Sequence, residues 1–154
     1  MSVPIFYHVV QRLSMIDYSK LEKSLSHLDL QYANFLASPN RVDLSTLDQE
    51  AIAESCIQRF EVCYDCLWKV LKRFLIEVLG IPDVPNSPKP VFRLANENKL
   101  LNENIASWIR YADTRINTAH DYDGNKAQDC IAQLGTFLND ARNIYVLMSE
   151  QKLD

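Results

Sequence analysis

The chain has 154 residues, which suffices for one domain with a substantial hydrophobic core. Apolar residues make up 47% of it and exclude a disordered chain, and a net charge of −4 excludes a strongly basic nucleic-acid coat. Any contact with RNA must therefore be local, at a few arginines and lysines. Long stretches lack both glycine and proline, and they predict an all-α protein.

The first 15 residues are apolar enough to pack on something, for instance a second subunit, either as an arm or as a fifth helix. No cationic region precedes their apolar stretch and no small-residue cleavage site follows it, so we expect no secretory peptide. No apolar run reaches the roughly 20 residues that span a bilayer. We expect a cytoplasmic protein, with residues 1–15 as an N-terminal extension and residues 16–150 as a single helical domain.

Apolar residues recur every three to four positions from Tyr18 to Leu36, which predicts an amphipathic helix that ends at Pro39. A polar connection, residues 40–45, leads to the longest predicted helix. Ser45 or Thr46 can cap that helix at its start.

The long helix is expected to end at Gly80 and Pro82, which makes it about 50 Å long at 1.5 Å per residue. Its main apolar stripe includes Phe60, Tyr64, Leu67 and Leu71. A second apolar edge widens the predicted buried stripe, as a central helix with several partners requires, and it consists of Val62, Cys66 and Val70.

A proline-rich loop over residues 81–90 precedes a short predicted helix, roughly 88–99, with Pro88 at its first position. Asn102 can cap the next helix, whose pattern lasts to Ala119, and the final helix follows the loop 121–124. These elements predict an up-and-down bundle of four or five helices. Leu134 and Phe137 of the final helix join the four apolar residues of the long helix in the predicted core.

Cys63 and Cys66 have the C-x-x-C spacing of some zinc and redox sites. Structural zinc usually needs a second ligand pair, and the sequence offers none at a recognisable spacing. Buried small side chains and free thiols explain the four cysteines, so we expect neither a metal nor another cofactor.

The long helix also carries two carboxylates one turn apart, Glu61 and Asp65. Such a like-charge pair is mildly unfavourable unless a cation lies nearby. Arg59, Lys69 or an arginine from elsewhere, such as Arg115, can supply it. The alternative is a charged face exposed to solvent.

The run from Arg115 to Tyr122 (RINTAHDY) combines a permanent cation, a titratable imidazole and a phenol near a helix end. A guanidinium suits a phosphate and a histidine suits proton transfer near neutral pH, so Arg115 and His120 are candidates for binding and cleaving a phosphodiester. The alternative is a cation and a histidine that merely favour the helix dipole.

Helical geometry places residues 115 and 120 about 140° apart around a straight helix. Either the helix frays near Ala119, or the two residues face a groove that a second copy completes. A twofold dimer would bring two arginines and two histidines together. There, the arginines could neutralise a scissile phosphate while one histidine takes the proton of a ribose 2′-hydroxyl, without any metal.

Two motifs together resemble a known family. The long helix carries the run QRFEVCYDCLWKVLK at residues 58–72, and the pattern Arg-x4-His-x-Tyr follows at Arg115, His120 and Tyr122. They resemble the signatures of the nucleotidyltransferase substrate-binding proteins, which belong to the HEPN superfamily. The resemblance covers roughly residues 17–148.

The resemblance implies a dimeric helical bundle made beside a separate minimal nucleotidyltransferase, often as a toxin–antitoxin module. It implies a metal-independent ribonuclease that uses Arg115 and His120, and a partner that transfers AMP to Tyr122. An alternative implied by the family name is a non-catalytic subunit that binds substrate or nucleotide. This chain departs from many HEPN ribonucleases in having Ile116 directly after the arginine, where a polar residue is usual. Asn117 is the nearest polar substitute, about 100° further around the helix.

Overall fold

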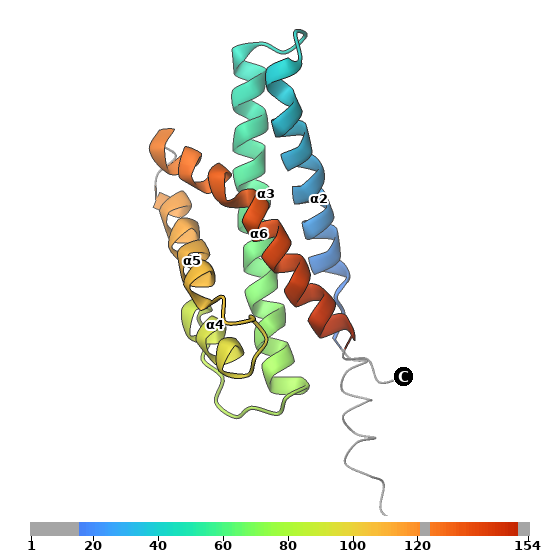
Figure 1. Cartoon of the computed structure of the whole chain (residues 1–154), viewed down its shortest axis with the longest axis vertical. Helices are drawn as coiled ribbons and strands as arrows, with labels where there is room; N and C mark the ends of the chain where they lie inside the picture. The colour runs from blue at the N-terminus through green and yellow to red at the C-terminus, as the bar shows by residue number, and fades with distance from the viewer. Residues whose placement is uncertain (1–15, 121–123, 151–154) are drawn as a thin grey trace, which may run out of the picture.

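The computed structural model of the chain describes residues 16–120 and 124–150. Two antiparallel helices form its long axis, α2 (Ser19–Ala37) and α3 (Thr46–Glu77), and they stand side by side in Figure 1. A short 3-10 turn, η1 (Ser38–Asn40), holds Pro39 and follows α2 directly. The predicted end of the first helix at this proline is therefore confirmed.

Both ends of α3 follow from local chemistry. The Ser45 hydroxyl accepts a hydrogen bond from the Asp48 backbone N–H at 3.0 Å, and the Asp48 carboxylate accepts one from the Ser45 N–H at 3.0 Å. This reciprocal pair satisfies two N–H groups that the first helical turn leaves open. At the other end, Gly80 has a φ of +66°, a conformation that glycine adopts without steric cost.

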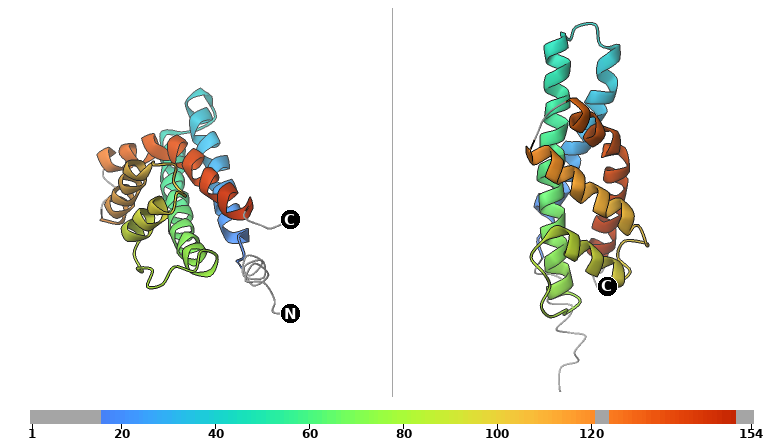
Figure 2. Two further views of the ribbon diagram at one scale, coloured as in Figure 1. Left: turned by 60° about the horizontal axis from the view of Figure 1, so that its bottom comes forward. Right: turned by 90° about the vertical axis from the view of Figure 1, so that its left-hand side faces the viewer.

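The remaining helices pack around α3. The short helix α4 (Pro88–Glu97) lies beside the end of α3, and α5 (Ile105–His120) runs back along it. The last helix, α6 (Gly124–Glu150), crosses in front of α3 and contacts α2, α3 and α5 (Figures 1 and 2). No strand occurs within residues 16–120 and 124–150, which confirms the all-α bundle. Over the same two ranges, no helix combines the length and the apolarity needed to cross a bilayer.

Aromatic rings join four helices at the centre of the bundle. Phe137 of α6 lies 4.9 Å from Phe60 of α3 and 5.3 Å from Tyr111 of α5, measured between ring centroids. Trp108 of α5 lies 4.9 Å from Phe92 of α4. The predicted core is confirmed, because each of its members is at most 1% exposed: Phe60, Tyr64, Leu67, Leu71, Leu134 and Phe137.

Two sequence predictions about these helices were wrong. Asn102 does not cap α5: it lies in the left-handed region (φ 49°), and the helix begins at Ile105, with the Trp108 N–H bonded to the Asn104 carbonyl at 3.4 Å. In the predicted second apolar edge of α3, Cys66 and Val70 are partly buried and pack against the core, but Val62 is 63% exposed and does not widen the buried stripe. The apolar residues of α3 therefore cover a wider arc of the helix than the neighbouring helices bury.

Candidate functional site

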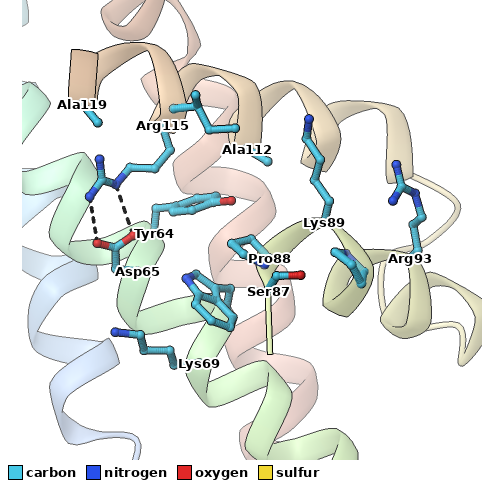
Figure 3. Close-up of a pocket in the computed structure, with 13 residues that line it drawn as sticks. Tyr64, Asp65, Lys69, Ser87, Pro88, Lys89, Arg93, Ala112, Arg115 and Ala119 are labelled. Atoms are coloured by element: carbon cyan, nitrogen blue, oxygen red, sulfur yellow. Dashed lines mark hydrogen bonds and ion pairs between the residues drawn. The ribbon is translucent and has the colours of Figure 1, made fainter. Parts of the chain in front are cut away.

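Arg115 projects from the last turns of α5 towards α3, where it meets both predicted carboxylates. Its Nε and Nη2 donate to the two oxygens of Asp65 at 3.2 and 3.0 Å, and its Nη1 donates to Glu61 Oε2 at 2.8 Å (Figure 3 draws the Asp65 pair). The guanidinium thus grips Asp65 with two parallel hydrogen bonds, the geometry that makes arginine–carboxylate pairs strong and directional. These contacts join positions 50 and 54 residues apart in the chain.

The surroundings of this pair keep Arg115 in one orientation. Its side chain is 25% exposed, that of Glu61 is 17% exposed and that of Asp65 is 40% exposed. The Thr118 hydroxyl lies 3.2 Å from the same Glu61 oxygen. The hydrogen bond to Asp65, ahead of other causes, raises the pKa of Arg115 above its ordinary value. Arg115 is therefore the cation that offsets the repulsion between Glu61 and Asp65 on α3.

The two other cations considered for that role have different neighbours. Arg59 contacts the His27 ring on α2, with 3.1 Å between Arg59 Nη1 and His27 Nδ1. The Lys69 ammonium lies 5.9 Å from the centre of the Trp68 ring. Neither contact involves Glu61 or Asp65.

Two properties of the Arg115 cluster decide what it can bind. The three hydrogen bonds use three of the five N–H groups that a guanidinium offers, so two remain for a ligand. However, the guanidinium is already paired with two carboxylates, which offset its positive charge. The cluster can orient a phosphate, but it cannot by itself attract one. Other cations must supply that attraction.

A cavity of about 670 Å³ opens directly beside Arg115, between α3, α4 and α5. Its walls are largely apolar, and cations stand on its rim, including Lys69, Lys89 and Arg93 (Figure 3). Lys89 forms an ion pair with Asp113 of α5. The volume falls in the range of small-molecule sites. The residues that form its apolar surface are Tyr64, Trp68, Pro88, Pro90, Ala112, Ile116 and Ala119.

The sequence pointed to Arg115 but not to this cavity. Lys89 and Arg93 stand one turn apart on α4, a spacing that was visible in the sequence as a basic face on the short helix. Their proximity to Arg115 depends on how α4 packs against α3 and α5.

The structure describes some of the other predicted site residues but not all of them. His120 is the last residue of α5, so the helix does not fray near Ala119; the His120 side chain and all of Tyr122 lie outside the described residues. Ile116 lines the cavity. Asn117 is exposed and takes no part in the cavity lining.

The cysteines are buried or partly buried in the bundle. Burial raises the pKa of Cys63 to about 12 and that of Cys56 to about 11, so their thiols stay protonated at neutral pH. All four cysteines are free. In the described part of the chain, no group of three or more histidine, cysteine or acidic side chains is placed to hold a metal ion.

Comparisons with known proteins agree with this architecture. Residues 16–150 match the family model described as "Nucleotidyltransferase substrate binding protein like". A Haemophilus influenzae protein named "Probable ribonuclease HepT" is 32% identical over 92 residues, which cover 58% of this chain and 62% of that protein. The match thus spans less than two thirds of that relative. A crystal structure of a Thermus thermophilus protein superposes with a TM-score of 0.67 at 27% identity, over 83% of this chain and 98% of the other. The chain belongs to the nucleotidyltransferase substrate-binding protein family of the HEPN superfamily.

Proposed function

We propose that this chain is the HEPN subunit of a two-protein nucleotidyltransferase module of the toxin–antitoxin kind, and that it cleaves RNA without a metal through Arg115 and His120. The observation that carries the proposal is Arg115 itself: two carboxylates orient it, two of its N–H groups remain for a ligand, and a cation-rimmed cavity opens beside it. The name of the Haemophilus relative supports it.

The proposed reaction is an internal transfer within the RNA strand. The ribose 2′-oxygen attacks the adjacent phosphorus as His120 takes its proton, and the bond from phosphorus to the 5′-oxygen breaks. The leaving oxygen receives a proton from a second group, which a second histidine can provide. The products are a 2′,3′-cyclic phosphate and a free 5′-hydroxyl. Arg115 stabilises the charge that builds on the phosphoryl oxygens.

A second copy of the chain completes this site in the proposal. Helix α5 continues to His120, and two positions five residues apart on a helix are separated by about 140°, too far to hold one phosphate. A twofold axis beside α5 would place the arginine of one copy near the histidine of the other. The exposed Ile116, 51% accessible, gives this part of α5 an apolar surface to bury in the dimer.

The decisive experiment uses purified protein and a fluorescently labelled RNA. We expect cleavage that persists in EDTA, with a cyclic phosphate end identified by mass spectrometry. Light scattering at micromolar concentration should give twice the chain mass of 17.8 kDa, about 36 kDa. Protein that leaves RNA intact and does not slow growth when expressed alone would contradict the ribonuclease. A mass of one chain would contradict the shared site.

The cavity favours a second candidate function, a non-catalytic subunit that binds a nucleotide for the transferase. An aromatic and proline surface with cations at the rim suits a base with its phosphates. Calorimetry with ATP would separate the two functions. Micromolar ATP binding without RNA cleavage would favour the nucleotide-binding subunit.

We expect the transferase encoded beside this chain to add AMP to Tyr122. The added phosphate would compete with substrate for the free N–H groups of Arg115, so modification would inhibit cleavage. Mass spectrometry after incubation with the transferase and ATP should find an added AMP group, about 329 Da, on Tyr122 of the wild type and none on Tyr122→Phe. Tyr145→Phe is the matched control and should be labelled normally. Full labelling of Tyr122→Phe would reject the assignment.

A further inference from the structure

A second groove, of about 390 Å³, runs between α2 and α3. Its cationic lining residues are Lys20, Lys23 and Arg59, and Ser24 and His27 also line it. Among residues 16–120 and 124–150, no acidic residue lines it, although the chain as a whole has a net charge of −4. A group of three cations in one groove of an acidic protein favours the binding of an anion.

The acidic side chains of α2 interact with α6, which explains why they do not line the groove. Glu22 accepts a hydrogen bond from the Tyr145 hydroxyl at 3.1 Å, and Asp29 forms an ion pair with Arg142. Both partners belong to α6. Helix α2 therefore turns these acids towards α6 and its lysines towards the groove with α3.

Only one ridge of side chains on α3 separates this groove from the Arg115 cavity. Val62 and Cys66 line the groove, and Asp65 and Lys69, three positions further on in each case, line the cavity. Residues at this spacing are neighbours on a helix surface, about 5–6 Å apart. Cys66 on the ridge also lies within the electrostatic reach of lysines on both sides. Burial raises the pKa of its thiol, and the positive charges of Lys20 in the groove and Lys69 in the cavity both oppose that rise.

We propose that the α2–α3 groove binds the phosphates of a single-stranded RNA whose scissile bond lies at Arg115. The strand would cross the α3 ridge at Val62 and Lys69, with its flanking phosphates on Lys20, Lys23 and Arg59. This inference rests on the proposed ribonuclease function and extends it to a substrate longer than the reacting dinucleotide.

The need for such a groove follows from the charge at Arg115. Arg115 is already paired with two carboxylates, which weaken its attraction for a polyanion. Across the cavity and the groove together, seven cations face four acids, which are Asp17, Glu61, Asp65 and Asp113. The attraction for a strand thus comes from residues flanking the cluster, and the groove adds three cations to those of the cavity. Continuity with the Arg115 cavity favours RNA over an acidic protein segment as the occupant.

The test compares a groove variant with a charge-matched control, both in a His120→Ala background so that bound RNA is not cleaved. The groove variant neutralises its three cations as Lys20→Gln, Lys23→Gln and Arg59→Gln. The control removes three exposed cations outside the groove, as Arg41→Gln, Lys99→Gln and Arg110→Gln. All six positions are exposed, so both variants should fold. The probes are a fluorescent single-stranded RNA of about 20 nucleotides and a trinucleotide, titrated over a range of salt.

We expect the groove variant to bind the long RNA at least about tenfold more weakly than the control, with a salt slope lower by about 2, since each lost phosphate contact on a single strand removes about 0.7. Affinity for the trinucleotide, which does not reach the groove, should be equal in both. Equal binding of the long RNA by both variants would overturn the groove while leaving the ribonuclease proposal intact. A wild-type protein that binds no RNA would overturn both. Tighter binding of poly-L-glutamate than of RNA, lost in the groove variant, would replace RNA with an acidic protein partner.

Discussion

Replacing His120 with alanine should lower the rate of RNA cleavage by about 10²- to 10⁴-fold, the usual contribution of a group that transfers a proton in the transition state. His120 is the last residue of α5, and we expect the variant to keep the helical fold. Circular dichroism and single-turnover cleavage would check the two expectations. A His120→Ala protein that cleaves at the wild-type rate would remove the histidine from the mechanism.

Arg115→Ala should lower cleavage by a similar factor, about 10²- to 10³-fold, because the arginine stabilises charge on the phosphoryl oxygens. This variant needs more care than the first. It leaves Glu61 and Asp65 facing each other without the guanidinium, partly shielded from water. That should cost about 1–3 kcal/mol of stability, so lost activity alone could reflect a disturbed fold.

A companion variant separates the two effects. Arg115→Ala combined with Glu61→Gln and Asp65→Asn removes the two carboxylate charges together with the guanidinium, and its melting temperature should return towards that of the wild type. Activity should stay lost if Arg115 touches the substrate phosphate. Recovered activity in the combined variant would show that Arg115 serves only to hold α5 against α3.

Phe137→Ala should destabilise the bundle by about 3–5 kcal/mol, a large share of the roughly 5–15 kcal/mol typical of a domain. Phe137 is fully buried, and its ring contacts Phe60 on α3 and Trp108 and Tyr111 on α5. Deleting the ring leaves a cavity where three helices meet. For a chain of this length, the melting temperature should fall by roughly 10 °C or more.

The matched control for this variant lies on the same helix. Val146 is 45% exposed, and Val146→Ala should change stability by no more than about 0.5 kcal/mol. Denaturant unfolding of both variants gives the comparison. A loss below about 1 kcal/mol for Phe137→Ala would contradict the packing described here.

The helices and the core of this protein could be predicted from the sequence alone, because both depend on local patterns. A repeat of three to four residues marks which face of a helix is buried, and it identified Phe60, Tyr64 and Leu134 without any knowledge of their neighbours. Ser45 and Gly80 marked the ends of α3 through contacts and torsions within one turn. Local signals failed where neighbours decide burial, as at Val62, and where backbone torsion decides the cap, as at Asn102.

The charge and shape of the site were decided by the tertiary structure. Arg115 and Asp65 are 50 residues apart, and no pattern along the chain tells which of several cations will reach a given carboxylate. Only the packing of α5 on α3 places the Arg115 guanidinium against Glu61 and Asp65. The packing of α4 likewise brought Lys89 and Arg93 to the rim of its cavity, and that of α2 gathered Lys20, Lys23 and Arg59 in one groove. Electrostatic attraction depends on distances in space, so these properties could not be read from the order of residues.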